Sequence, residues 1–265
     1  MMKEFHNKGY WAIILGGSSG LGLASAKKLA KHGMNICIIH RDSREQLGLI
    51  QNEFDAIKLE GIEFMSFNAD AINSNKRDEM LLQIKDKLGN TGRVRCLLNS
   101  IAKGSLKPMV HELGPTLSND DFQITLQAMA ISLYDWTKAI FDNRLFSSDA
   151  RVISFTSEGN TKAMENYAAV SAAKAALEAI SRNIALEFAP FGLRSNCIQA
   201  GVTYTKSFQM IPQSDKIIEY SKNRNPFKRL TVPEDIANAV YLLCLDEAAW
   251  INGALIPVDG GERIS

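Results

Sequence analysis

Short apolar runs alternate along the chain with longer segments of mixed polarity. The seven apolar runs lie at residues 11–15, 36–39, 62–67, 94–98, 152–155, 193–198 and 254–258. Runs of this length without polar alternation are typical of strands in a parallel sheet, because helices cover both faces of such a sheet. The segments between the runs are long enough for crossover helices, and right-handed crossovers place these helices on both faces of one sheet.

The pattern therefore predicts an α/β fold with a single doubly wound, Rossmann-type domain over residues 1–265 and a seven-stranded parallel sheet. Helices are expected up to Gly33, through about Glu60, and near 75–88, 119–146, 166–189 and 233–245. The segment Gly201–Pro226 breaks the rhythm because it is long and of mixed polarity. It predicts a substrate-loop insertion at about 202–226, either a mobile lid or a helical insertion packed on the core.

Composition and charge narrow the class of protein. The chain has 265 residues, 46 % of them hydrophobic, and its 30 basic and 29 acidic residues give a net charge of +1. This balance offers no electrostatic reason to bind nucleic acid or an anionic membrane. The start of the chain, Met1-Met2-Lys3-Glu4-Phe5-His6, is too polar for a secretory signal, and no run approaches the ~20 apolar residues of a membrane helix.

The cysteines indicate a reducing compartment. Cys37, Cys96, Cys197 and Cys244 form no C-x-x-C pair and have no histidine cluster beside them. Three of the four lie in apolar stretches, so buried reduced thiols are expected, and neither a disulfide framework nor a metal site is. With the polar N-terminus, this pattern predicts a cytoplasmic protein.

The first apolar run leads into a glycine-rich loop, Gly16-Gly-Ser-Ser-Gly20-Leu-Gly22, which opens a helix. The spacing G-x-x-x-G-x-G differs from the commoner G-x-G-x-x-G, but the physics is the same. Glycines let backbone N–H groups approach a pyrophosphate closely, and the helix dipole favours its negative charge. The candidate dinucleotide-binding residues of this loop are Gly16, Ser18, Ser19, Gly20, Leu21 and Gly22.

The end of the second apolar run indicates which dinucleotide is bound. In NAD-selective folds an acidic residue at this point receives the ribose 2′-OH. Here the chain reads His40-Arg41-Asp42-Ser43-Arg44, with His40 at the acidic position. Because arginine pairs bidentately with a phosphate, Arg41 favours NADPH over NADH. The alternative is that Arg41 and Arg44 only solvate a helix start, with Asp42 as its N-cap.

Several motifs together resemble the short-chain dehydrogenase/reductase family over about residues 9–261. They are Gly16–Gly22, Asn68-Ala-Asp70, Asn99-Ser100-Ile101-Ala102 and Val258-Asp-Gly-Gly261. The resemblance implies that Asp70 holds the adenine edge and that Asn99, Ser100 and Ile101 line the cofactor cleft. It also implies that Ala200–Thr205, with Thr203 and Thr205, covers the nicotinamide.

The predicted helix over 166–189 carries the candidate catalytic residues. Most family members have Tyr-x-x-x-Lys here, whereas this chain has Tyr167 and Lys174, with Ser171 at the usual lysine position. Seven residues bring Lys174 to within about 20° of Tyr167 around a helix and about 10 Å along its axis, and helical side chains lean toward the N-terminus. This Tyr-x6-Lys spacing resembles the NADPH-dependent bacterial enoyl-acyl-carrier-protein reductases. The resemblance implies that both residues are catalytic and that Lys174 also binds the cofactor ribose.

Two further positions bear on the reaction. Met129 stands where ketone-reducing members have an asparagine that bridges a water to the lysine, and a thioether cannot relay a proton. However, Ser157 stands where many enoyl reductases have a second tyrosine, and Ala163 stands where some relatives have it. A carbonyl reductase would instead use a hydroxyl of Ser154, Thr156 or Ser157.

These observations leave three hypotheses open. The first is NADPH-dependent reduction of the 2,3-double bond of a 2-enoyl thioester, carried on acyl carrier protein or coenzyme A, as in fatty acid biosynthesis. The second is reduction of a 3-oxoacyl or other carbonyl group, and the third is a non-catalytic NADP(H)-binding regulatory protein. The resemblance also implies a homotetramer or homodimer. Close helix packing, or burial against the sheet, would suit the small side chains of Ala168, Ala172, Ala175, Ala176 and Ala179.

Overall fold

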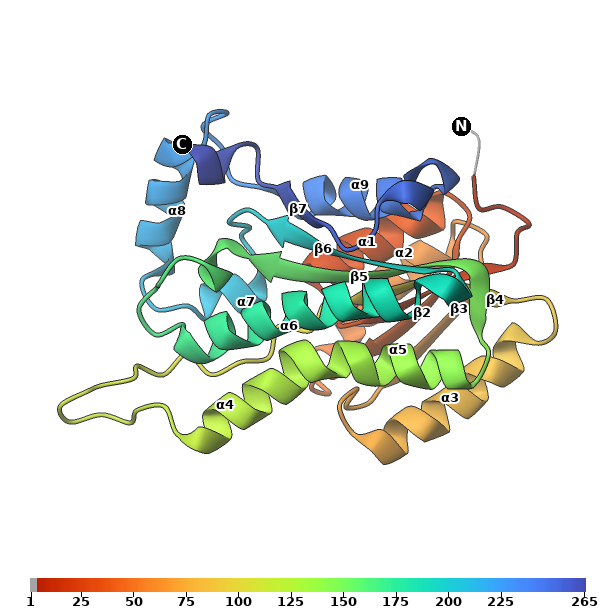
Figure 1. The fold of residues 1–265 in the computed structure, drawn as a ribbon, viewed down its shortest axis with the longest axis horizontal. Coiled ribbons are helices and arrows are strands. Elements are labelled where there is room, and N and C mark those ends of the chain that lie inside the picture. Colours follow the sequence, from red (N-terminus) through yellow and green to blue (C-terminus); the bar gives the residue numbers. More distant parts are fainter. Residues whose placement is uncertain (1–3) are drawn as a thin grey trace.

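A seven-stranded parallel sheet organises the molecule (Figure 1). The computed structural model describes residues 4–265, so residues 1–3 of the predicted domain and of the polar N-terminus lie outside the described residues. The strands are β1 (Tyr10–Leu15), β2 (Asn35–His40), β3 (Phe64–Asn68), β4 (Arg93–Asn99), β5 (Phe146–Ser157), β6 (Leu193–Ala200) and β7 (Leu255–Val258). Their order, β3-β2-β1-β4-β5-β6-β7, confirms the doubly wound Rossmann-type prediction. The strand order reverses between β1 and β4, where folds of this kind bind ligands at the carboxyl ends of the strands.

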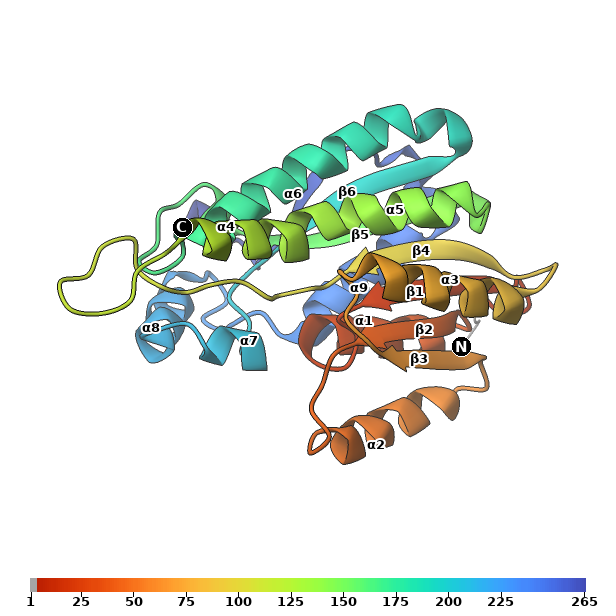
Figure 2. The same cartoon turned by 90° about the horizontal axis from the view of Figure 1, so that it is seen from below.

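Helices cover both faces of the sheet. They are α1 (Gly20–Lys31), α2 (Leu47–Lys58), α3 (Ser74–Leu88), α4 (Asn119–Leu126), α5 (Ser132–Asp142), α6 (Ala168–Glu187), α7 (Lys206–Gln209), α8 (Ser214–Arg224) and α9 (Pro233–Cys244). Figure 2 shows α3, α4, α5 and α6 on one face, with α1, α2 and α9 on the other. The short helices α7 and α8 lie beyond the carboxyl ends of the strands, at the left in Figure 1.

Two apolar cores fill the space between sheet and helices. Ile14 on β1 joins the core beneath α1, α2 and α9, whereas its neighbour Ile13 joins the core beneath α3, α5 and α6. This alternation follows from the strand period of two. Both isoleucines are fully buried, and burying such a side chain is worth about 1.5–3 kcal/mol. The apolar runs of the central strands therefore mark strands buried on both faces, whereas the edge strands β3 and β7 are only partly buried.

The long helix expected near 119–146 is confirmed over residues 119–142, but one turn of it is π-helical and it ends earlier than predicted. Residues Gln127–Ile131 between α4 and α5 form a π-helical turn with Met129 at its centre, and α5 ends at Asp142. Arg144 takes a left-handed conformation (φ 57°), which reverses the chain before β5 begins at Phe146. No local sequence signal marks a π turn, because it differs from an α turn by one inserted residue.

The Ala-rich helix expected over 166–189 begins later than the sequence indicates. Asn166 is left-handed (φ 60°), and Tyr167 is the N-cap with φ −117° and ψ 3°, so α6 starts at Ala168. The helical angle and rise between Tyr167 and Lys174 therefore describe the structure only approximately. Of the small residues on α6, Ala172 and Ala175 are exposed, so neither is buried against the sheet. An oligomer that packs through this face stays a prediction.

The irregular segment after β6 contains α7 and α8 and is therefore partly helical. The cysteine prediction is confirmed, since all four thiols are free and buried. Within residues 4–265, no helix has the length and apolarity to cross a membrane. The same residues contain no group of three or more His, Cys, Asp or Glu side chains that could hold a metal ion.

Candidate active site

The predicted site residues gather at the carboxyl ends of the central strands. The glycine-rich loop follows β1, Asn99 ends β4, Ser157 ends β5 and Ala200 ends β6. Parallel pairing places these four strand ends side by side, since Leu15 pairs with Asn99 and Ser157 pairs with Ala200. The topology thus brings together segments that are up to about 185 residues apart in the chain.

The glycine-rich loop forms a cradle that side chains would fill. Gly16 and Gly20 have positive φ angles of 81° and 54°. A Cβ on Gly22 would lie 2.3 Å from the Gly16 carbonyl oxygen, and one on Gly16 would lie 2.7 Å from the Ser100 carbonyl oxygen. The first turn of α1 contains no acidic residue, and the Ser19 side chain makes no capping hydrogen bond. The free N-terminus of α1 and this cradle fit a pyrophosphate.

The side of the cradle next to β2 is polar and carries a cation. Arg41 forms an ion pair of 2.5 Å with Asp70 and keeps most of its side chain exposed. His40 Nδ1 lies 2.8 Å from Asp42 Oδ2. Because α2 begins at Leu47 with Gln46 as its N-cap, the alternative in which Asp42 caps that helix is wrong. Arg41 is therefore available to a phosphate if it leaves Asp70.

The segment after β4 is fixed by its own asparagine. Asn99 is buried, and its Nδ2 donates to Ser132 Oγ on α5 at 3.2 Å, while its Oδ1 accepts from the Ile101 backbone N–H at 3.2 Å. The Ser100 N–H donates to the Leu15 carbonyl at 2.9 Å. These hydrogen bonds fix the backbone of Ser100 and Ile101 beside the glycine-rich loop.

The segment after β6 returns to the same loop. Thr205 is the N-cap of α7, where its hydroxyl accepts from the Phe208 N–H, and its methyl carbon would lie 3.4 Å from a Cβ on Gly20. Thr203 is buried, and its hydroxyl donates to the Gly201 carbonyl at 2.9 Å. Thr205 therefore lies against the cradle, whereas the hydroxyl of Thr203 is used within its own turn.

Tyr167 and Ser157 form a pair of hydroxyl side chains at the end of β5. The Tyr167 ring packs against Gly159, where a Cβ would lie 2.6 Å from the ring and 3.4 Å from Ser157 Oγ. Ser157 Oγ is buried and makes no hydrogen bond of good geometry within residues 4–265. Burial raises the pKa of the Tyr167 hydroxyl, and the neighbouring Ser157 offsets part of that rise. Tyr167 is thus a protonated hydrogen-bond donor at neutral pH.

Lys174 is buried on the side of α6 that contacts β5. Its Nζ donates a hydrogen bond of 2.6 Å to the Phe155 carbonyl on β5, two residues before Ser157. Burial lowers the pKa of Lys174 to about 8, while Cys197 and Glu178 act in the opposite direction. The structure therefore places Lys174 against β5, two residues before Ser157, as a cation that loses its charge slightly above neutral pH.

Two polar residues of α6 that the sequence analysis did not assign to the site hold the turn after β5. Ser171, at the usual lysine position, donates through its hydroxyl to the Gly159 carbonyl. Glu178 accepts hydrogen bonds from Thr156 and Asn160. Both lie at helical spacing from Lys174, on the buried side of α6, and that spacing is the signal that would have found them.

An apolar wall borders Tyr167. Met129 is buried with Ala128, Val170 and Ala173, and Tyr167 packs against this cluster. Met129 thus occupies an apolar position, and Gln127, the polar residue of the π turn, donates its Nε2 hydrogen bond to Asp135 at 3.1 Å. The site therefore combines one phenol and one ammonium with an apolar surface.

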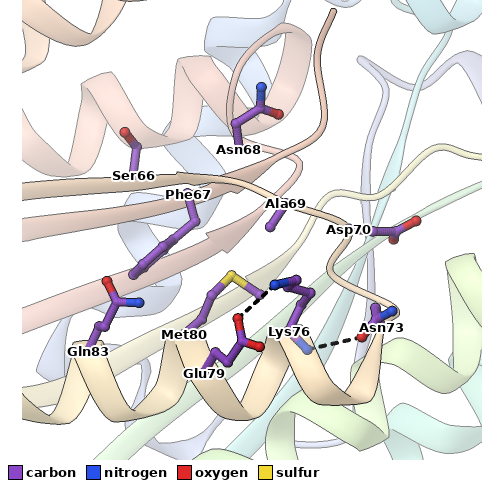
Figure 3. A pocket seen from close by; sticks show the side chains of 10 residues that line it. All are labelled: Ser66, Phe67, Asn68, Ala69, Asp70, Asn73, Lys76, Glu79, Met80 and Gln83. Atoms are coloured by element: carbon purple, nitrogen blue, oxygen red, sulfur yellow. Dashed lines mark hydrogen bonds and ion pairs between the residues drawn. The ribbon is translucent and has the colours of Figure 1, made fainter.

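A pocket outside this site lies between β3 and α3 (Figure 3). Its volume is about 580 Å³, and its lining residues are Ser66, Phe67, Asn68, Ala69, Asp70, Asn73, Lys76, Glu79, Met80 and Gln83. Lys76 and Glu79 pair with each other across its rim at 2.8 Å. The pocket touches the cradle region only through Asn68–Asp70 and contains neither Tyr167 nor Lys174.

Comparisons with known proteins agree with this architecture. A family model described as enoyl-(acyl carrier protein) reductase matches residues 16–262. A tropinone reductase homolog of Arabidopsis thaliana is 24 % identical over 99 % of this chain and 96 % of its own length. A probable 2,4-dienoyl-CoA reductase of Bacillus subtilis is 28 % identical over 96 % of each protein.

Solved structures share the fold over nearly the whole chain. A dehydrogenase/reductase from Sinorhizobium meliloti superposes with a TM-score of 0.85 at 23 % identity, covering 99 % of this chain and 98 % of that one. An enoyl-(acyl-carrier-protein) reductase from Anaplasma phagocytophilum, solved in complex with NAD, gives a TM-score of 0.81 at 18 % identity and covers 100 % of this chain and 94 % of that one. At these identities the likeness concerns the fold.

Proposed function

The chain belongs to the short-chain dehydrogenase/reductase family of oxidoreductases, and on that premise we propose that it reduces the 2,3-double bond of a 2-enoyl thioester with NADPH. The observation that carries this proposal is the composition of the site around Tyr167. Met129 and Val170 form an apolar wall beside Tyr167. Lys174 follows Tyr167 at the Tyr-x6-Lys spacing, and its ammonium is buried against β5. An apolar acyl chain fits such a wall better than a polar substrate does.

The residues of the chain divide the work of the reaction. When bound, the dinucleotide supplies the hydride that adds to the β-carbon of the thioester. Tyr167 donates a hydrogen bond to the thioester oxygen, where negative charge builds in the transition state. Lys174 holds the ribose hydroxyls and, as a cation, stabilises negative charge near Tyr167. A proton taken up from solvent water at the α-carbon then completes the saturated thioester.

A second candidate function rests on Ser157. Its buried, unpaired hydroxyl beside Tyr167 would suit a carbonyl reductase in which the serine orients the carbonyl oxygen and Tyr167 donates the proton. The likeness to a tropinone reductase homolog agrees with this alternative. In the enoyl reductase Ser157 would only assist the binding of the thioester oxygen.

Oxidation of NADPH with crotonyl and acetoacetyl thioesters, measured side by side, separates the two reactions. We expect oxidation with the crotonyl thioester and less than about one hundredth of that rate with the acetoacetyl thioester. Ser157→Ala, assayed in parallel, is expected to reduce the crotonyl rate less than about tenfold. Turnover of the acetoacetyl thioester alone, abolished in Ser157→Ala, would instead establish the carbonyl reductase. If NADPH bound and neither thioester were reduced, the proposal would give way to the regulatory protein.

Arg41 is expected to set the preference for NADPH. Replacing Arg41 by Ala removes a bidentate partner of the 2′-phosphate, so NADPH affinity should fall by about 10–100-fold while NADH affinity changes little. Fluorescence titration with each dinucleotide measures both. Arg44→Ala is the matched control, because Arg44 is also exposed in the same loop. An equal loss of NADPH and NADH affinity in Arg41→Ala would refute a role in phosphate recognition.

The carrier of the acyl substrate and the oligomeric state of the protein are further parts of the same proposal. The substrate is carried on acyl carrier protein or coenzyme A, α7 and α8 contact its acyl chain, and the protein works in the cytoplasm as a homotetramer or homodimer. Exposed apolar side chains are available for these contacts at Met210 in the insertion and at Ile124 on α4. Light scattering on the purified protein tests the assembly, and a monomeric mass would contradict it.

A further inference from the structure

The carboxylate of Glu178 joins α6 to the segment that carries Ser157. Glu178 lies on the buried face of α6, one helical turn beyond Lys174, and only 9 % of its surface is exposed. Its Oε1 accepts a hydrogen bond of 2.5 Å from Thr156 Oγ1 at the end of β5, and another of 2.5 Å from Asn160 Nδ2 in the turn that follows. These two donors flank Ser157 in the chain, so one carboxylate oxygen fixes both sides of this residue.

Glu178 also lies one helical turn from Lys174, on the buried face of α6. The groups that raise the pKa of Lys174 are the Cys197 thiol on β6 and the Glu178 carboxyl group. The contribution of β5 is neutral, because Lys174 bonds the Phe155 carbonyl. Burial raises the pKa of Cys197, so this thiol is neutral near pH 7, as is the Tyr167 phenol. Within residues 4–265, Glu178 is then the carboxyl group that raises the pKa of Lys174.

We propose that Glu178 is a positioning residue of this site, which keeps Lys174 in its cationic form. Through Thr156 and Asn160, the same carboxylate keeps the Ser157 segment against α6. The inference rests on the proposed function, in which a cationic Lys174 binds the cofactor ribose. It adds to that function a pH limit that is set by a residue without contact to the substrate.

The sign of the pH dependence follows from burial. A buried ammonium is destabilised in its charged form, and a neighbouring carboxylate restores that form. Glu178→Gln removes the negative charge, but its amide oxygen still accepts hydrogen bonds from Thr156 and Asn160. The pKa of Lys174, about 8 in the native protein, should therefore fall by about one unit or more. Above the lowered pKa, Lys174 is neutral and binds the ribose hydroxyls less well.

Two measurements on the full-length protein test this. The first follows the Cε resonance of 13C-labelled lysine in the ligand-free protein by NMR against pH, with Lys174→Met to assign Lys174. The second is NADPH affinity from pH 6 to 9 by fluorescence. In Glu178→Gln we expect a midpoint for Lys174 that is lower by about one unit or more, and NADPH affinity about tenfold weaker at pH 8 but within threefold of native at pH 6.

Matched variants separate charge from structure. Glu187→Gln removes a carboxylate from the exposed end of the same helix and should leave the Lys174 midpoint unchanged. Thr156→Val removes a hydrogen bond to Glu178 but keeps its charge, so it should not lower the midpoint. Glu178→Asp keeps the charge and should hold the midpoint within about half a unit of native.

An unchanged Lys174 midpoint in Glu178→Gln would overturn the inference, and so would NADPH binding that weakens equally at every pH. If Glu178→Gln failed to fold, Glu178→Asp would decide, because a drop of about one unit there would show that the charge does not set the midpoint. The NMR midpoint needs neither substrate nor cofactor. A failure of thioester reduction would therefore overturn the proposed function without touching this result.

Discussion

Tyr167→Phe should lower kcat for thioester reduction by about 10²–10⁴-fold, because it removes the hydroxyl that donates to the developing negative charge. The ring still packs on Gly159 and the apolar wall, so the fold should be retained. NADPH affinity should stay within threefold of native. Steady-state kinetics and NADPH fluorescence titration on the same preparation measure the two effects. The loss is expected in kcat rather than in KM, because the hydrogen bond strengthens in the transition state.

Tyr134→Phe is the matched control for this prediction. Tyr134 lies on α5 with 44 % of its surface exposed, and it takes no part in the cluster around Tyr167. Its variant should retain the native kcat. A Tyr167→Phe enzyme with more than a tenth of the native kcat would contradict the role of this hydroxyl, and would direct attention to Ser157 as the donor.

Gly22→Ala should weaken NADPH binding by at least about 100-fold. The new Cβ would lie 2.3 Å from the Gly16 carbonyl oxygen and 3.0 Å from Ser100 Oγ, so the backbone of the loop must open. This opening would displace both the backbone N–H groups of the loop and the first turn of α1, which are expected to bind the pyrophosphate. Fluorescence titration measures the affinity, and thermal unfolding reports how far the fold itself is disturbed.

Gly48→Ala provides the comparison. Gly48 lies in α2, no atom comes within 4 Å of a Cβ placed there, and its φ is not positive. Alanine in this helix should stabilise the protein by about 0.5–1 kcal/mol and leave NADPH affinity unchanged. If Gly22→Ala bound NADPH as well as Gly48→Ala does, the glycine-rich loop would not be the pyrophosphate site.

Most of the fold was predictable because it is encoded by neighbours in the sequence. Each strand is a short apolar run, and each crossover helix is long enough to be recognised by its length and period. The π turn at Gln127–Ile131 and the reversal at Arg144 were missed, because no local sequence signal marks either of them. The start of α6 was placed too early, because a polar residue such as Asn166 before an alanine-rich run resembles a helix start. Its left-handed conformation is not visible in the sequence.

The candidate site divides in the same way. The glycine-rich loop, Arg41, Tyr167 and Lys174 were recognisable from residue type and spacing alone. The sequence did not determine that Lys174 is buried against the Phe155 carbonyl, that Ser157 lies unpaired beside Tyr167, or that Glu178 bridges Thr156 and Asn160. Each of these contacts joins α6 or its N-cap to the end of β5 and the turn that follows it.

By itself, the sequence determined the class of fold, the glycine-rich loop and the identity of the phenol and ammonium groups, because each depends on residues within one turn or one strand. The tertiary structure alone decided the charge state of those groups. The pKa of Lys174 depends on desolvation by the sheet and on a carboxylate held by β5. Burial and electrostatic partners are properties of space, and they arise only when distant segments of the chain meet.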